Sequence, residues 1–205
     1  MKLPNILTLS RLGMAALMMA LLTVNFPYSK SLALLVFSIA GITDYFDGYL
    51  ARNVYGETSF GRLMDPLADK VLVCAAFVSF VAMRLPTRAA LPLVPAWIVV
   101  IIISREFLVT GLRLLAVSKG KIISAGKWGK HKTIWQIIAI VAILLGQAVR
   151  EDLLKNASPT LLQNFDLVYG TVALGISIAV VMITVVSGGM YFVQHRNLIS
   201  EHVRV

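Results

Sequence analysis

The sequence has little charge and almost no cysteine. Only 14% of its 205 residues are charged, whereas about a quarter of the residues in a soluble domain are charged. The one cysteine, Cys74, lies inside an apolar run, so a disulfide framework within the chain is excluded. The sequence also lacks internal repeats and low-complexity tracts, which excludes a repeat architecture.

Hydrophobic residues make up 58% of the chain, and its mean hydropathy is +0.82. They form long runs without the strict alternation of a membrane β-barrel, so helices are the expected form. The sequence therefore predicts an all-α fold, an integral membrane bundle of six transmembrane helices in a single domain, residues 1–205. The expected spans are residues 12–26, 31–52, 62–83, 91–116, 134–149 and 167–192.

Two short segments flank the predicted six-helix core of residues 12–192. Residues 1–11 combine leucine and isoleucine with polar side chains, and they predict a short N-terminal amphipathic helix in the membrane interface. A cleaved signal peptide is the alternative, but this run lacks a small-residue cleavage site and the chain stays hydrophobic beyond it. Residues 193–205 predict a cytoplasmic tail.

The formal net charge of +9 comes from basic residues that cluster between the hydrophobic runs. This position favours membrane lipid headgroups and phosphate-bearing substrates as partners, rather than nucleic acid. With the N-terminus inside, most of the 19 Lys and Arg residues fall on the inner side, as the positive-inside rule requires. We predict a multi-pass protein of the cell inner (cytoplasmic) membrane whose active site faces the cytoplasm. The basic residues expected outside are Lys30, Arg84, Arg88, Arg150 and Lys155.

Four carboxylates occur at fixed offsets in the pattern D-x2-D-G-x2-A-R-x8-G-x3-D-x3-D. Carboxylates beside hydrocarbon are costly unless they pair or bind a cation, and a set of four suits one or two hard divalent ions such as Mg²⁺ or Mn²⁺. Ion pairing with Arg52, Arg62 and Lys70 is the alternative, but it would not require this spacing or the glycines. The pattern is filled by Asp44, Asp47, Gly48, Ala51, Arg52, Gly61, Asp65 and Asp69.

These eight positions resemble, without a departure, the signature of the CDP-alcohol phosphotransferase family. The resemblance implies an integral membrane enzyme, typically a homodimer, that moves a phosphatidyl or similar group from a CDP-linked donor to an alcohol and releases CMP. In that family the first three aspartates bind metal, and the fourth accepts the proton and can also contact metal. The metal ligands expected here are therefore Asp44, Asp47, Asp65 and Asp69, with Asp69 as the catalytic base.

The same resemblance implies a binding site for the CDP part of the donor. Arg52 matches the family arginine that contacts CDP, and Thr58 stands where the family often has a hydroxyl residue. Gly48, Ala51 and Gly61 lack bulky side chains, as a close approach of a base or diphosphate requires. Helix packing and a turn are the alternative explanations for the two glycines.

A second group of charged residues lies between residues 104 and 133. Arg105, Arg113, Lys130 and Lys132 are expected to bind the phosphate of the acceptor, because guanidinium and ammonium groups offset phosphate charge. The alternatives are that Arg105 and Glu106 neutralise each other and that the lysines only anchor the loop at the inner surface. SREF (residues 104–107) and GKHKT (residues 129–133) are most similar to family members that use sn-glycerol 3-phosphate with CDP-diacylglycerol.

Three other functions remain open at this point. A sister enzyme of the family could use inositol phosphate, inositol or serine as the acceptor. A Mg²⁺-dependent membrane prenyltransferase would carry a second acidic cluster, which the fourth and fifth predicted spans lack. A transporter would be expected to show half-repeats and broken helices, and neither is visible in the sequence.

Overall fold

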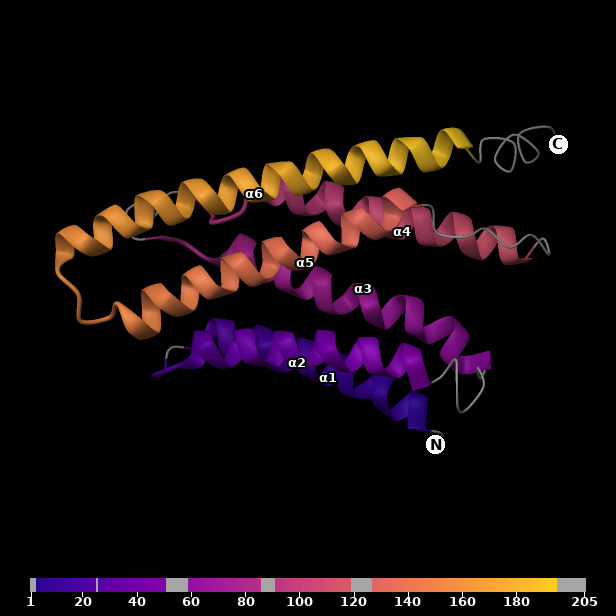
Figure 1. Ribbon diagram of the computed structural model, residues 1–205, viewed down its shortest axis with the longest axis horizontal. Coiled ribbons are helices and arrows are strands. Elements are labelled where there is room, and N and C mark those ends of the chain that lie inside the picture. Colours follow the sequence, from indigo (N-terminus) through magenta and orange to yellow (C-terminus); the bar gives the residue numbers. More distant parts are fainter. Residues whose placement is uncertain (1–2, 25, 51–58, 86–90, 119–126, 195–205) are drawn as a thin grey trace.

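The computed structural model describes the backbone of residues 3–24, 26–50, 59–85, 91–118 and 127–194, and the side chains of residues 9–24, 26–43, 70–85, 91–116 and 131–194. Within these ranges the chain is helical, and its one strand-like pairing is an isolated bridge between Arg84 and Pro92. The all-α prediction is confirmed. The helices are α1 (Leu3–Thr23), α2 (Ser29–Leu50), α3 (Ser59–Ala82), α4 (Ala96–Ser118), α5 (Lys127–Ala148) and α6 (Pro159–Gln194), and a π-helical segment, η3 (Val149–Leu153), extends α5 (Figure 1).

Successive helices run in opposite directions through the bundle (Figure 1). The end of α2 and the start of α3, which carry the aspartate pattern, lie toward one end of the bundle, together with the start of α1 and the ends of α4 and α6. We call this the motif end. The turn between α1 and α2 and the connection from η3 to α6 lie at the opposite end.

The first helix is continuous, although the sequence predicted an interfacial segment of residues 1–11 and a separate span from Leu12. α1 runs from Leu3 to Thr23 without a break. Its one proline, Pro4, occupies the first turn, where a missing N–H costs nothing. Because the next proline is Pro27, nothing in the sequence interrupts the helix at Leu12.

The last helix begins before the predicted membrane span of residues 167–192. α6 begins at Pro159 rather than Leu167 and is 36 residues long. Ser158 and Pro159 are a favourable pair of residues for a helix start, and the Leu162 N–H donates to the Ser158 carbonyl at 3.1 Å. α4, in contrast, begins later than predicted, at Ala96 rather than Leu91, because prolines precede it.

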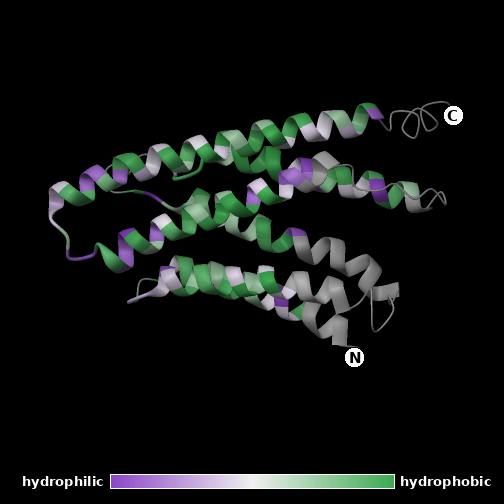
Figure 2. Ribbon diagram, in the orientation of Figure 1, coloured by the Kyte–Doolittle hydropathy of each residue, from purple (hydrophilic) through white to green (hydrophobic). Residues whose placement is uncertain are grey.

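The outside of the bundle is largely apolar. Many leucine, isoleucine, valine and tryptophan side chains on the described helices are exposed, whereas Ser177, Thr184 and Ser187 of α6 are buried. Figure 2 shows hydrophobic residues along most of the described helices. An extended apolar exterior marks a surface that contacts something other than water, so this distribution supports a membrane protein.

Two helical stretches among the described residues are long and apolar enough to cross a membrane. They are His131–Leu153 and Pro159–Gln194. Shorter apolar stretches occur at Leu9–Thr23, Ser29–Thr43 and Lys70–Ala82. α4 is interrupted by charged residues near its middle. Six transmembrane spans therefore remain a prediction.

The core joins all six helices through close packing. Phe77 and Phe80 of α3 are fully buried and meet edge to face, with ring centroids 6.0 Å apart. α5 and α6 approach closely at Gly146, where an added Cβ would lie 2.2 Å from Cε2 of Tyr169. The Tyr169 hydroxyl also donates to the Ile143 carbonyl at 2.8 Å, so the position of this ring is fixed.

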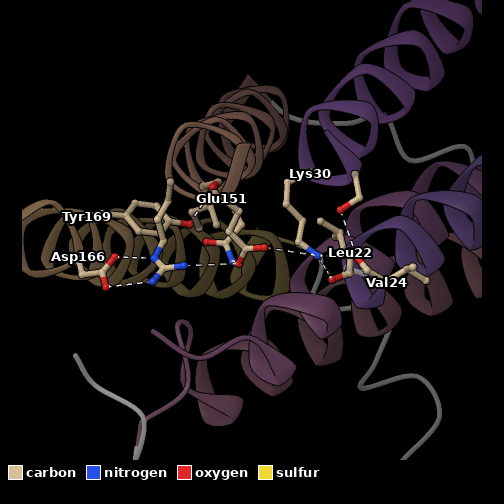
Figure 3. A network of polar contacts seen from close by, with 10 residues as sticks. Leu22, Val24, Lys30, Glu151, Asp166 and Tyr169 are labelled. Carbon is tan, nitrogen blue, oxygen red and sulfur yellow. Dashed lines mark hydrogen bonds and ion pairs between the residues drawn. The ribbon is translucent and has the colours of Figure 1, made fainter. Parts of the chain in front are cut away.

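A polar network closes the bundle at the end opposite the motif (Figure 3). Lys30 donates to the carbonyls of Leu22 and Val24, at 2.7 and 3.0 Å, and lies 3.8 Å from Glu151. Arg150 makes a two-pronged contact with the buried Asp166, at 2.6 and 3.4 Å. The network links α1, α2, η3 and α6 at this end of the bundle.

Candidate active site

The aspartate pattern is carried by two consecutive helices. Asp44 and Asp47 fall in the last two turns or so of α2, and Asp65 and Asp69 fall in the first three turns or so of α3. Their side chains lie outside the described residues, so their roles as metal ligands and base stay predictions. The same holds for the expected donor-binding residues Gly48, Ala51, Arg52, Thr58 and Gly61.

The chemistry of the aspartate set fits a divalent cation. Four carboxylates supply the hard oxygen ligands that Mg²⁺ and Mn²⁺ prefer. Among the side chains that the structure describes, no group of three His, Cys, Asp or Glu residues is placed to hold a metal. The aspartate pattern, whose side chains lie outside the described residues, therefore stays the predicted metal site.

A buried ionic cluster surrounds Glu106 in the middle of α4. Glu106 is 3% exposed, and its carboxylate accepts a hydrogen bond from the Lys132 ammonium of α5. Lys70 of α3 lies 2.9 Å from the same carboxylate, and the guanidinium of Arg105 lies 3.6 Å away. The side-chain amide of Gln136 lies within 3.5 Å. We call these five residues the Glu106 cluster.

Counted over the side chains that the structure describes, the Glu106 cluster carries surplus positive charge. Three cations from three helices face one carboxylate, and Lys132 is only 2% exposed. A buried carboxylate without a partner would be strongly destabilising, which accounts for the convergence of cations on it. One negative charge cannot neutralise three positive ones, so the cluster is suited to attract a further anion.

Arg105 also connects α4 to α6. Its Nη2 donates to the Ser187 hydroxyl at 3.3 Å. Its aliphatic stem lies over Gly188, where an added Cβ would be 3.0 Å from Cγ. Nε of Arg105 is buried and has no hydrogen-bond partner among the described residues. The guanidinium therefore retains an unused donor.

Arg113 makes a second connection to α6. It lies eight residues after Arg105 and so about two turns further along α4, toward the motif end. Its Nε lies 3.4 Å from the Tyr191 hydroxyl, and its guanidinium sits 5.6 Å from the centre of the Tyr191 ring. Contacts with the hydroxyl and the ring face both suit a cation.

The structure brings together two of the four residues expected to bind the acceptor. Arg105 and Lys132 meet at Glu106, whereas Arg113 contacts Tyr191 instead. Lys130 belongs to the first turns of α5, and its side chain lies outside the described residues. Glu106 does not pair with Arg105 alone, because Lys132 and Lys70 are nearer.

A model of the CDP-alcohol phosphatidyltransferase family matches residues 1–187. The chain belongs to this family. A relative from Bacillus subtilis (strain 168), named CDP-diacylglycerol--glycerol-3-phosphate 3-phosphatidyltransferase, is 41% identical over 155 residues, which cover 70% of this chain and 76% of the relative. Relatives of the same name from Rickettsia bellii (strain RML369-C) and Pseudomonas fluorescens are 37% and 33% identical. Each alignment covers 70% of this chain, and 75% and 72% of the two relatives respectively.

The matched region of this CDP-alcohol phosphatidyltransferase family member contains both the aspartate pattern and the Glu106 cluster. Lys70 and Glu106 are not among the site residues predicted from the sequence. Glu106 carried a usable signal, since a carboxylate inside an apolar helix is a functional candidate by default. Lys70 carried one as well, because it directly follows Asp69.

Proposed function

We propose that the chain transfers the phosphatidyl group of CDP-diacylglycerol to sn-glycerol 3-phosphate and releases CMP. The product would be phosphatidylglycerophosphate, a precursor for phosphatidylglycerol. Family membership and the shared name of the three relatives support the reaction class. The observation that carries the choice of acceptor is the surplus positive charge of the Glu106 cluster, which borders the helix that bears Asp65 and Asp69.

In this reaction a hydroxyl oxygen of the acceptor attacks the phosphorus that bears the diacylglycerol. The bond from that phosphorus to the CMP oxygen breaks, and CMP leaves with the electron pair. Asp69 takes the proton of the attacking hydroxyl. Asp44, Asp47 and Asp65 would hold Mg²⁺ or Mn²⁺, which offsets the diphosphate charge when bound.

The acceptor phosphate is bound by Arg105, Arg113, Lys130 and Lys132 in this proposal. The buried donor on Arg105 supports its part, because a phosphate oxygen would complete the hydrogen bonding of its guanidinium. Lys132 can bind the acceptor phosphate as well as Glu106, because its ammonium has three N–H groups and one carboxylate does not use all of them. Gly48, Ala51, Arg52, Thr58 and Gly61 would line the donor site.

We further propose that the single domain crosses the inner membrane six times, with the motif end at the cytoplasmic face. The antiparallel helices place the start of α1 and the end of α6 toward the same end (Figure 1). α6, at 36 residues, measures about 54 Å, which exceeds a hydrocarbon core of about 30 Å. A homodimer follows from the family resemblance.

An acceptor panel tests the proposed function. The purified protein in detergent receives CDP-diacylglycerol, a divalent cation and one acceptor: glycerol 3-phosphate, inositol phosphate, inositol or serine. CMP release is expected with glycerol 3-phosphate. Release with another acceptor alone would identify a sister enzyme, and no release with any acceptor would contradict the reaction class.

A further inference from the structure

Glu106 contacts two residues that are proposed to bind the acceptor and a third that adjoins the proposed base in the sequence. Arg105 and Lys132 are proposed to bind the acceptor phosphate, while Lys70 directly follows the proposed base, Asp69, on α3. We infer that Glu106 is a positioning residue for the acceptor site: its buried carboxylate orients Arg105 and Lys132 and ties the part of α3 next to Asp69 to α4 and α5. The inference rests on the proposed function.

Burial makes Glu106 suited to this task. It is 3% exposed and Lys132 is 2% exposed, so water cannot replace the hydrogen bond between them. Lys70 lies at the edge of the cluster, where its side chain is 28% exposed and its ammonium is 2.9 Å from the Glu106 carboxylate. Of the three cations at this carboxylate, Lys132 is therefore deeply buried and Lys70 is partly exposed.

Stability alone does not account for a carboxylate at this position. Burying a salt bridge removes two charges from water, and well-packed apolar side chains of similar volume are often at least as stabilising. The surrounding core already contains such residues, including Ile98 and Ile102 on the same helix. What the carboxylate adds is a fixed direction for three cations.

Glu106→Gln is the decisive substitution, because the amide keeps the size of the side chain but loses its charge. Without that charge the cations repel one another and lose their common partner. Misplacement of a binding group by about 1 Å can cost on the order of a hundred-fold in rate. We expect kcat/KM for glycerol 3-phosphate to fall by about ten- to a hundred-fold, with a raised KM for this acceptor. KM for CDP-diacylglycerol should stay close to the wild-type value.

Three further variants make the test specific. Glu106→Asp keeps the charge on a shorter side chain, so its KM for the acceptor should lie between the values of wild type and Glu106→Gln. Glu106→Gln combined with Lys132→Met should lose less than the product of the two single losses, because the residues act as a unit. Glu151→Gln removes a carboxylate from the network at the opposite end, about 28 Å along the helix from Lys132. It should leave both KM values unchanged.

The outcomes separate positioning from simple support of the fold. A structural role would lower the amount of active enzyme and thus the apparent kcat, with both KM values unchanged, and that result would overturn the inference. Independent losses in the double variant would also overturn it. If Glu106→Gln cannot be recovered folded, Glu106→Asp decides: a raised acceptor KM supports positioning and an unchanged one refutes it. If the wild-type protein uses a different acceptor, the proposed function fails, and the same kinetics with that acceptor still test Glu106.

Discussion

Gly188 and Gly189 allow a paired test of Arg105 that leaves its charge in place. An alanine Cβ at Gly188 would lie 3.0 Å from Cγ and 3.5 Å from Nε of Arg105, whereas a Cβ at Gly189 would meet nothing within 4 Å. The Arg105 side chain must therefore move by a few tenths of an ångström in Gly188→Ala. Its contacts with Ser187 and Glu106, at 3.3 and 3.6 Å, are already long and would be disturbed.

The magnitude follows from the hydrogen bond that is at risk. A hydrogen bond to a charged group contributes about 1.5–3 kcal/mol, and a full loss corresponds to about ten- to a hundred-fold in kcat/KM. Because the flexible arginine can partly adjust, we expect a smaller loss than that, about three- to ten-fold, in kcat/KM for glycerol 3-phosphate. Both alanines should also favour the helix by up to about 1 kcal/mol, so thermal stability should not fall in Gly189→Ala.

Steady-state kinetics with each substrate varied in turn, together with thermal unfolding in detergent, would measure both effects. Gly188→Ala should raise KM for the acceptor, and Gly189→Ala should match wild type. Equal kinetics for the two alanine variants would refute the placement of Arg105 at the acceptor. A loss shared by acceptor and donor would mean that the contact between α4 and α6 supports the whole site instead.

Three more predictions test the base, the packing and the orientation. Asp69→Asn should lower kcat by about 10²–10⁴-fold while CDP binding persists; a full loss of CDP binding would reassign Asp69 as chiefly a metal ligand. Gly146→Ala should lower the unfolding temperature, at a cost of about 1–3 kcal/mol, because its Cβ would overlap the Tyr169 ring; an unchanged melting curve would contradict that close approach. In a cysteine-free background on intact cells, a cysteine at Ser158 should react with an impermeant thiol reagent and one at Thr58 should not. The reverse labelling pattern would overturn the proposed orientation.

The helical fold was predictable from hydropathy, but several helix boundaries were not. Hydropathy locates apolar runs, so it detected the helices, but the last apolar run begins only at Leu167, within α6. α6 begins at Pro159, directly after Ser158. Asp166 is charged and lowers the local hydropathy, although it is buried in the fold, so hydropathy alone does not extend the apolar run back to Pro159. Likewise α5 begins at Lys127, because a polar stretch can be helical without being apolar. Hydropathy therefore locates these helices without fixing the residues at which they begin.

The candidate site was predictable only where local spacing defines it. The aspartate pattern spans 26 residues and could be read directly from the sequence. The Glu106 cluster could not, because Glu106 meets Lys132 across 26 residues and Lys70 across a helix packing contact. Such pairings depend on how α3, α4 and α5 pack, which no local pattern encodes. The sequence suggested Arg105, the adjacent residue, as the partner of Glu106, but Lys132 lies nearer to its carboxylate.

Product analysis with the wild-type protein tests whether the chain transfers a phosphatidyl group to glycerol 3-phosphate. CDP-diacylglycerol and glycerol 3-phosphate would be incubated with Mg²⁺ or Mn²⁺, and CMP and lipid products would be followed together by mass spectrometry, with Asp65→Asn as the matched control. We expect phosphatidylglycerophosphate and CMP to appear in equal amounts, and both to vanish without the metal ion or in the variant. CMP release without phosphatidylglycerophosphate, or the same product yield from Asp65→Asn, would contradict this expectation.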